Sequence, residues 1–245
     1  VDTVIGVARD KQLYRQRFSR GTPLDGLEEL GPTPNRRGTS VSFVPDPEIF
    51  GDHGRFKPQR LYRMARSKAY LFAGVEIRWK CAPELIGDDT PAEATFQFPG
   101  GLADHLKEQI GTRECATAEP FVGRQDFPGD QGRAEWAIAW PLWSDGSYSW
   151  YCNTIPTPAG GTHEAGLRSA LTKGLRAFGE LIGQKKAVQI TAEDVFNGGE
   201  MMLSVFIRDP QFQSQTKDRL SSPEAARFTQ NAVRDHFDHF LSDNM

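Results

Sequence analysis

The stretch that decides the fold is Asp209-Pro210-Gln211-Phe212-Gln213-Ser214-Gln215-Thr216-Lys217. A strongly apolar run at 202–207 precedes it and indicates a buried strand. Ser222-Pro223-Glu224 follows and supplies an N-cap, a first-turn proline and an early acid for a last helix. A loop in this position can project the Gln215 amide and the Lys217 ammonium toward a neighbouring module. That pair suits a terminal phosphate, although a lone lysine is more often a solvated surface group.

Apolar periodicity predicts the elements that precede this loop. We expect a helix over 163–182, a shorter one through 102–110, and a helix start at Thr191 with Asp194 three residues later. Residues 136–140 and 148–151 alternate as strands, and we expect them to pair around the turn at Ser144-Asp145-Gly146. His163 has no nucleophile or carboxylate beside it in the sequence, so Gly160-Gly161-Thr162-His163 indicates backbone geometry and helix capping.

The first third of the chain has the period of strands. We expect strands at 4–7 and 13–18 around a turn at Arg9-Asp10-Lys11, a long polar loop over 21–37, and a third strand over 38–45 with Val41 and Phe43 on one face. A helix over 57–72 and a strand over 75–79 follow. The polar loop 82–93 is the predicted boundary. The class is therefore α+β in two modules, 1–93 and 94–245.

Composition excludes several kinds of protein. The 245 residues carry a net charge of −3, so affinity for nucleic acid must come from local basic patches. Three cysteines without a CxxC spacing indicate no zinc site and no disulfide framework, which fits a reducing cytoplasm. His236 and His239 are typical of a polar helix face more than of a metal pair. No apolar run is long enough to cross a membrane. The N-terminus has no signal-peptide pattern and no Met, so we expect the chain to be cut from something longer.

Four segments carry a family resemblance. The run 209–222 resembles the QTK loop of bacterial type IIA DNA topoisomerase B subunits. Residues 153–163 (NTIPTPAGGTH) are similar to that family's N-x-I-x-T-x-x-GGTH signature. Tyr14-Arg15-Gln16 and 38–46 (GTSVSFVPD) resemble the last strands of its GHKL-type ATPase domain. The resemblance implies the end of that ATPase domain over 1–93, followed by a transducer domain over 94–245 with a ribosomal protein S5 domain 2-like fold.

The resemblance also implies roles for five residues. Lys217 would touch the γ-phosphate of ATP with the help of Gln215. Thr39 would hydrogen-bond the adenine and its ordered water, and Arg9 would lie at the rim of that pocket. Arg168 would line the cavity that holds a DNA duplex and would contact its phosphates. Judged on residue type alone, a threonine on a strand such as Thr39 is normally a satisfied structural hydroxyl and an arginine at a strand end such as Arg9 is normally solvated. For Arg168 the structural and the DNA-contacting interpretations stand about even.

The activity implied is ATP-dependent strand passage, with decatenation and relaxation of DNA. ATP and Mg²⁺ would be the cofactors of the full-length protein. Its partners in the cytoplasm and nucleoid would be DNA, the A subunit of topoisomerase IV, and a second copy of the B subunit. The segments 74–77, 119–123, 191–194 and 215–222 favour the topoisomerase IV branch over gyrase, which stays an alternative. A free-standing S5-like module that binds nucleic acid is a second alternative, disfavoured by the acidic charge.

Several parts of a complete ATP site are missing from the sequence. No G-x-G-x-x-G and no D-x-G-x-G occurs in residues 1–245. The family's water-activating carboxylate, its Mg²⁺-holding Asn and its adenine-binding Asp all precede the segment where this chain begins. We therefore expect this fragment to bind no nucleotide tightly and to be inactive as an ATPase.

Overall fold

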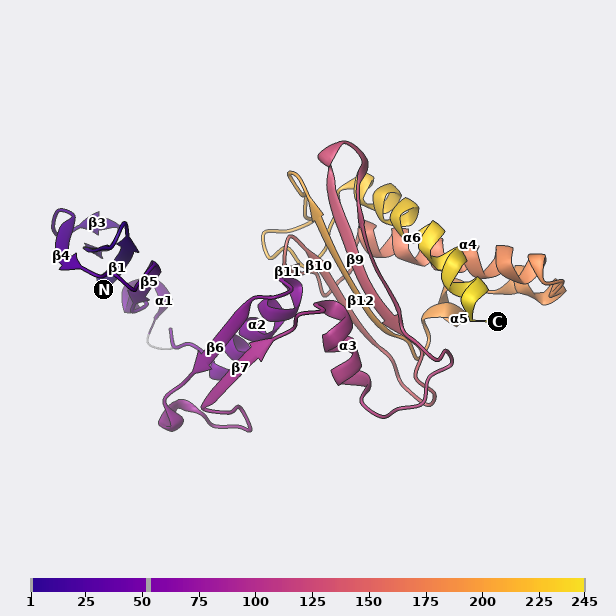
Figure 1. The fold of residues 1–245 in the computed structure, drawn as a ribbon, viewed down its shortest axis with the longest axis horizontal. Helices are drawn as coiled ribbons and strands as arrows, with labels where there is room; N and C mark the ends of the chain where they lie inside the picture. Colours follow the sequence, from indigo (N-terminus) through magenta and orange to yellow (C-terminus); the bar gives the residue numbers. More distant parts are fainter. Residues whose placement is uncertain (1, 52–53, 245) are drawn as a thin grey trace. The chain divides into compact units, whose positions relative to one another are not determined.

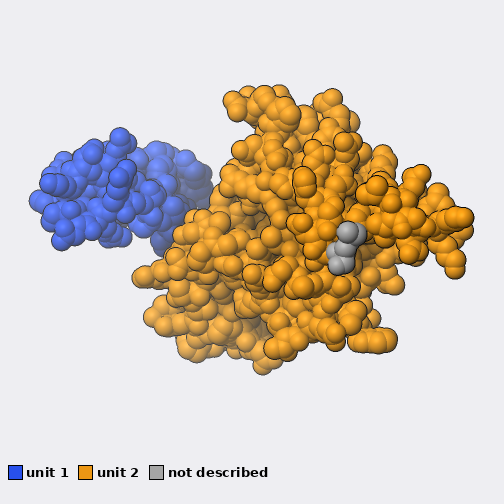
Figure 2. Space-filling model, turned by 45° about the vertical axis from the view of Figure 1, so that its right-hand side comes forward, with its two compact units in different colours: residues 1–61 blue, residues 62–245 orange. Residues whose placement is uncertain are grey.

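A computed structural model describes residues 2–51 and 54–244 of the chain. The chain divides into two compact units, residues 1–61 and residues 62–245 (Figure 2). Helix α2 (Pro58–Leu71) contains the division, since Leu61 ends the first unit and Tyr62 begins the second.

Unit 1 is a five-stranded antiparallel sheet with the order β3-β2-β1-β5, in which β4 also pairs with β2. Its elements are β1 (Asp2–Arg9), β2 (Gln12–Ser19), β3 (Thr22–Pro23), β4 (Glu28–Pro32), β5 (Gly38–Phe43) and the short helix α1 (Pro47–Phe50). The predicted turn between the first two strands is confirmed, with Asp10 at φ 51° and Lys11 at φ 62°. The predicted loop 21–37 is wrong in part, because β3 and β4 lie within it and use the free edge of β2.

Unit 1 has almost no core of its own. Among its described residues, Ala8 is the one buried hydrophobic side chain. Large apolar side chains are instead exposed, among them Val41, Phe43 and Phe50. A sheet buries its apolar face against another layer in a stable domain, so unit 1 has the character of part of a larger domain.

Unit 2 is built on a second five-stranded sheet with the order β11-β10-β12-β9-β8 (Figure 1). Its strands are β8 (Phe121–Asp126), β9 (Gly132–Ala139), β10 (Ser147–Cys152), β11 (Ile155–Pro156) and β12 (Glu200–Ile207). The helices are α3 (Leu102–Ile110), α4 (Thr162–Leu181), α5 (Ala192–Phe196) and α6 (Pro223–Asp243), with 3₁₀ turns at Pro83–Leu85, Pro128–Asp130 and Lys185–Gln189. The hairpin of β6 (Glu76–Lys80) and β7 (Glu93–Gln97) completes it.

The central strand β12 explains how unit 2 is layered. Leu203 and Val205 point into a core shared with α4 and α6, whereas Met202 points into a core shared with α2 and α3. A strand covered on both faces needs neighbours on both edges, and β12 has them, β9 antiparallel and β10 parallel.

Most of the predicted helices and strands are confirmed, and the capping box of Thr191 and Asp194 forms as expected. The predicted pairing of 136–140 with 148–151 is wrong. These strands are β9 and β10, and β12 lies between them. The turn at 144–146 therefore crosses the end of a third strand, and Gly146 approaches the backbone of Gly199 there.

The chain does not separate into compact units at the predicted boundary after residue 93. Strands β6 and β7 pair across it, from Glu76 opposite Gln97 to Lys80 opposite Glu93. Ile77 and Phe96, one from each side, also fill the same core. The compact units separate after Leu61 instead. The assignment of 1–93 and 94–245 to an ATPase domain and a transducer domain stays a prediction.

Candidate functional site

The loop that joins β12 to α6 is held closed at its base. Phe212 bridges to Leu220, Gln213 N donates to Arg219 O at 3.0 Å, and Ser221 N donates to Gln211 O at 2.8 Å. These bonds turn residues 211–221 into a short hairpin whose tip carries Gln215 and Lys217. We call residues 209–222 the QTK loop from here on.

Ser222 has a different role from the one predicted. It occupies the N-cap position of α6, but its side chain makes no cap hydrogen bond. Ser222 Oγ instead accepts from Gln211 N at 2.8 Å and is fully buried. The hydroxyl therefore fixes the start of the QTK loop to the start of α6, which a local capping pattern cannot reveal.

The QTK loop is docked on the double glycine of the second signature. Leu220 N donates to Gly160 O at 3.1 Å, Thr162 N donates to Leu220 O at 3.1 Å, and Ala159 N donates to Asp218 O at 2.9 Å. A Cβ on Gly161 would lie 2.3 Å from Leu220 O, and this residue has φ 141°. Glycine is thus required here by close backbone approach and by conformation. The two segments that carry the family resemblance, residues 153–163 and 209–222, are therefore hydrogen-bonded to each other.

Lys217 is exposed at the tip of this loop and has φ 61°. Its Nζ lies 5.7 Å from the ring centroid of Phe212. Within residues 2–51 and 54–244, no carboxylate forms an ion pair with it; the neighbouring Asp218 accepts instead from Thr216 Oγ1 at 2.5 Å. Gln215 is also exposed. The loop therefore presents an ammonium and an amide that are available to an anion.

The other residues of segment 153–163 have structural roles. Asn153 Nδ2 donates to Ile207 O and Asn153 Oδ1 accepts from Ile207 N, each at 2.9 Å, so this amide clamps the end of β12. Thr157 and His163 are fully buried and bond to each other through Oγ1 and Nε2 at 3.1 Å. Burial lowers the pKa of His163 to about 4, which leaves the ring neutral at physiological pH. The N-cap of α4 is Gly161, so this segment begins the helix as predicted, without a side-chain cap hydrogen bond.

Arg168 lies in the second turn of α4, and its side chain already has partners. Its Nε donates to Glu164 Oε1 at 2.8 Å, and its guanidinium lies 4.0 Å from the ring centroid of Phe196. A cavity of about 460 Å³ beside it is also lined by Glu193 and Asp194. Acidic neighbours compete with any phosphate for this guanidinium.

Thr39 and Arg9 share one face of the unit 1 sheet. Thr39 of β5 pairs directly with Val7 of β1, and Arg9 lies two residues after Val7 in β1. Because side chains alternate along a strand, all three point to the same side. Val41 and Phe43, both more than half exposed, continue this face. Arg9 Nε lies 3.5 Å from Asp10 Oδ2, and its side chain is 79% exposed. This exposed face therefore carries a hydroxyl and a guanidinium beside apolar side chains.

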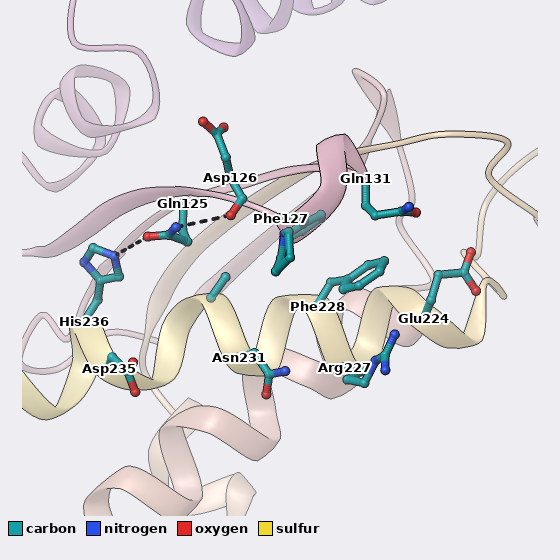
Figure 3. Close-up of a pocket in the computed structure, with 12 residues that line it drawn as sticks. Gln125, Asp126, Phe127, Gln131, Glu224, Arg227, Phe228, Asn231, Asp235 and His236 are labelled. Atoms are coloured by element: carbon teal, nitrogen blue, oxygen red, sulfur yellow. Dashed lines mark hydrogen bonds between the residues drawn. The ribbon is translucent and has the colours of Figure 1, made fainter.

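A cavity of about 780 Å³ lies between the β8–β9 hairpin and α6 (Figure 3). Phe127 stacks on Phe228 in it, and His236 Nε2 is hydrogen-bonded with Gln125 Oε1 at 3.2 Å. It gathers none of the five predicted site residues. In the described parts of the chain, no group of three metal-binding side chains occurs, and no helix is long and apolar enough to span a membrane.

A family profile described as DNA gyrase B matches residues 101–245, which is more than half of the chain. The chain belongs to the DNA gyrase B family. Both motifs that build the clamped QTK loop lie within the matched residues. The family predicted from the sequence is therefore confirmed.

Curated relatives match nearly the whole length of this member of the DNA gyrase B family. The B subunit of DNA topoisomerase 4 from Bartonella bacilliformis is 52% identical over 99% of this chain and 35% of that protein. The Escherichia coli K12 protein of the same name is 36% identical over 98% of this chain and 37% of that protein. The chain thus spans about a third of the length of these curated relatives.

Solved structures agree. The 43K ATPase domain of Thermus thermophilus gyrase B, in complex with an aminocoumarin, has a TM-score of 0.77 and 29% identity, over 99% of this chain and 64% of that one. The topoisomerase IV ATP-binding domain of Francisella tularensis, with a small-molecule inhibitor, has a TM-score of 0.78 and 26% identity, over 99% and 64%. The predicted α+β fold, GHKL-type ATPase strands followed by an S5-like transducer, is confirmed.

Proposed function

We propose that this chain is the part of a topoisomerase IV-type B subunit that couples the state of ATP to DNA strand passage. Its relatives carry the name of the DNA topoisomerase 4 B subunit, and its structural neighbours are ATPase domains, which supports this proposal. ATP and Mg²⁺ are the cofactors of the longer protein. Its partners at the nucleoid are DNA, the A subunit of the same enzyme, and a second copy of the B subunit.

One observation carries the proposal: Lys217 is exposed, without a carboxylate partner in the described residues, on a loop whose base is clamped. A charge-assisted hydrogen bond to a phosphate contributes about 1.5–3 kcal/mol. That free energy biases a two-state equilibrium about ten- to a hundredfold. Because the loop is already folded, little of this free energy is lost in ordering it.

The cycle follows from that single contact. ATP closes two B subunits around a DNA duplex, and Lys217 pairs with the γ-phosphate with the help of Gln215. Thr39 and Arg9 hold the adenine side of the nucleotide. Hydrolysis removes the phosphate and releases the loop, so the ion pair acts as a switch. Arg168 contacts DNA phosphates once they displace Glu164.

Hydrolysis itself belongs to the longer protein. Residues 1–245 contain no glycine-rich lid motif for the phosphates. The proposal therefore makes this fragment a sensing and coupling part that is inactive as an ATPase and holds nucleotide weakly when alone.

The first test removes the ammonium. In the full-length protein, reconstituted with its A-type partner into the complete enzyme, Lys217→Ala is expected to lower ATP turnover and DNA relaxation at least about tenfold, since the γ-phosphate loses its charged partner. Residue 217 has φ 61°, a conformation that strains alanine as it does lysine, so the substitution changes only the side-chain contacts. ATPase and relaxation assays measure the effect.

Lys107→Ala, an exposed lysine on α3, is the matched control and is expected to be neutral. Unchanged thermal unfolding of Lys217→Ala would establish that it folds. Near-normal turnover in a folded Lys217→Ala protein would refute the proposed role.

A further inference from the structure

Helix α2 joins the two units through one continuous backbone. It begins at Pro58 in unit 1 and ends at Leu71 in unit 2, where Ala69, Tyr70 and Leu71 are buried. Its last turn also carries Lys68.

Lys68 is anchored in an unusual way. Its Nζ donates to the carbonyl oxygen of Thr154 and to Thr154 Oγ1, each at 2.7 Å. The side chain is half-buried, and burial lowers the pKa of its ammonium with no opposing carboxylate among the described residues. A partly buried charge without a counter-ion depends on its hydrogen bonds, so Lys68 is tied to Thr154. Figure 1 shows the end of α2 next to β11, which follows Thr154.

Asn153 (φ 49°) and Thr154 (φ 65°) are two consecutive residues in the left-handed region. Such residues persist only where the surroundings hold them. Lys68 holds one and the end of β12 holds the other, since Asn153 bonds reciprocally with Ile207 and its N donates to Val205 O at 2.8 Å. The turn is thus fixed from both sides.

Ile207 ends β12, and Asp209, with φ 47°, begins the QTK loop two residues later. Direct contacts therefore run from α2 through Lys68, Thr154 and Asn153 to the base of the loop that presents Lys217. We infer that Lys68 is a positioning residue that transmits the state of the nucleotide-bearing unit through this turn to the QTK loop. The inference rests on the proposed function of Lys217 and adds a regulator of that site.

This series of contacts predicts an energetic coupling between Lys68 and Lys217. If Lys68 acts through Lys217, removing it matters only while Lys217 is present. A purely structural lysine would destabilise the protein to the same extent in either background. A double-mutant cycle separates these cases.

The experiment uses the full-length protein in the complete enzyme, as wild type, Lys68→Met, Lys217→Ala and the double variant. Methionine keeps the length of the side chain and removes the charge and its donors. The readout is the ratio of half-saturating concentrations of ADP and a non-hydrolysable ATP analogue, which reports recognition of the third phosphate. We expect Lys68→Met to reduce this ratio about tenfold, Lys217→Ala to reduce it further while leaving a measurable preference, and the double variant to match Lys217→Ala.

Controls keep the outcomes distinct. Lys107→Met, on α3, should leave the ratio unchanged, and Lys68→Arg should restore most of it. Thr154→Gly removes the hydroxyl acceptor and relieves the left-handed strain, so it tests the relay should Lys68→Met fail to fold; it is expected to lower the ratio with the same non-additivity.

Three results would overturn the inference. They are a wild-type ratio in folded Lys68→Met, additive effects in the double variant, or a wild-type ratio in Thr154→Gly when Lys68→Met does not fold. A normal preference in Lys217→Ala would instead refute the proposed function, and the relay with it.

Discussion

Glu200 is the clearest case of a single residue that holds distant segments together. Its carboxylate is buried at the start of β12. Oε1 accepts from Arg113 Nη1 at 2.9 Å and Oε2 accepts from Gln109 Nε2 at 2.9 Å, while Ser144 and Ser147 also donate to it. One carboxylate therefore joins α3 and the segment after it, the 144–147 turn and β12.

The pKa of Glu200 gives a prediction in pH. Burial alone would raise the pKa of its carboxyl, but hydrogen bonds from Ser147 and Arg113 outweigh it and hold the pKa below the usual 4.5. A lowered folded-state pKa stabilises the protein above about pH 4.5, and that contribution is lost as the pH falls through the folded value. Glu200→Gln should therefore cost about 2 kcal/mol at pH 7 and progressively less below pH 4.5.

Urea unfolding followed by tryptophan fluorescence measures this effect in unit 2, which contains all five tryptophans, at positions 79, 136, 140, 143 and 150. A destabilisation that stays the same at pH 7 and pH 3.5 would show that the ionised carboxylate is not what the cluster stabilises.

At the scale of elements, the N-terminus of α4 and the QTK loop can pack directly against each other because residue 161 is a glycine. Its Cβ position is occupied by the backbone of Leu220, a residue that is itself buried. Backbone, unlike a flexible side chain, cannot move aside without breaking the hydrogen bonds that clamp the loop.

Gly161→Ala is therefore expected to destabilise unit 2 by about 2–4 kcal/mol and to displace the QTK loop. Urea unfolding and amide exchange at Leu220 measure the two effects. Gly87→Ala, at a glycine with open space and no positive φ, should be neutral. Wild-type stability in Gly161→Ala would mean that the glycine is not required by close approach.

At the scale of the whole molecule, the two units differ in what holds them together. Unit 2 has two cores on opposite faces of its sheet, whereas Ala8 is the buried hydrophobic residue of described unit 1. Burial of apolar surface is the dominant favourable term in folding. Unit 1 therefore depends on strand hydrogen bonds until another layer covers it.

We expect amide hydrogens of β1 and β2 to exchange orders of magnitude faster than those of β9 and β12 in this chain. Hydrogen exchange read out by mass spectrometry tests this. In the full-length protein, β1 and β2 should gain protection. Equal protection of both sheets in the isolated chain would contradict the absence of a core in unit 1.

The sequence by itself determined the elements whose signals are local. The turn at Asp10-Lys11, the helices α2 and α4, and the Thr191 capping box all depend on neighbours within a few residues. The family motifs also stand in the sequence as contiguous runs, so the confirmed family and the candidate Lys217 and Gln215 could be named from it. The roles of these two residues stay predictions.

Only the tertiary structure decided which distant segments meet. Periodicity shows that a strand is buried but not which strand lies beside it, so it predicted β9 and β10 as partners, although β12 lies between them. The same reason hid the bond from Ser222 to Gln211 and that from Lys68 to Thr154. A hydrogen bond acts over about 3 Å in space at any separation in sequence, and local patterns carry no record of that distance.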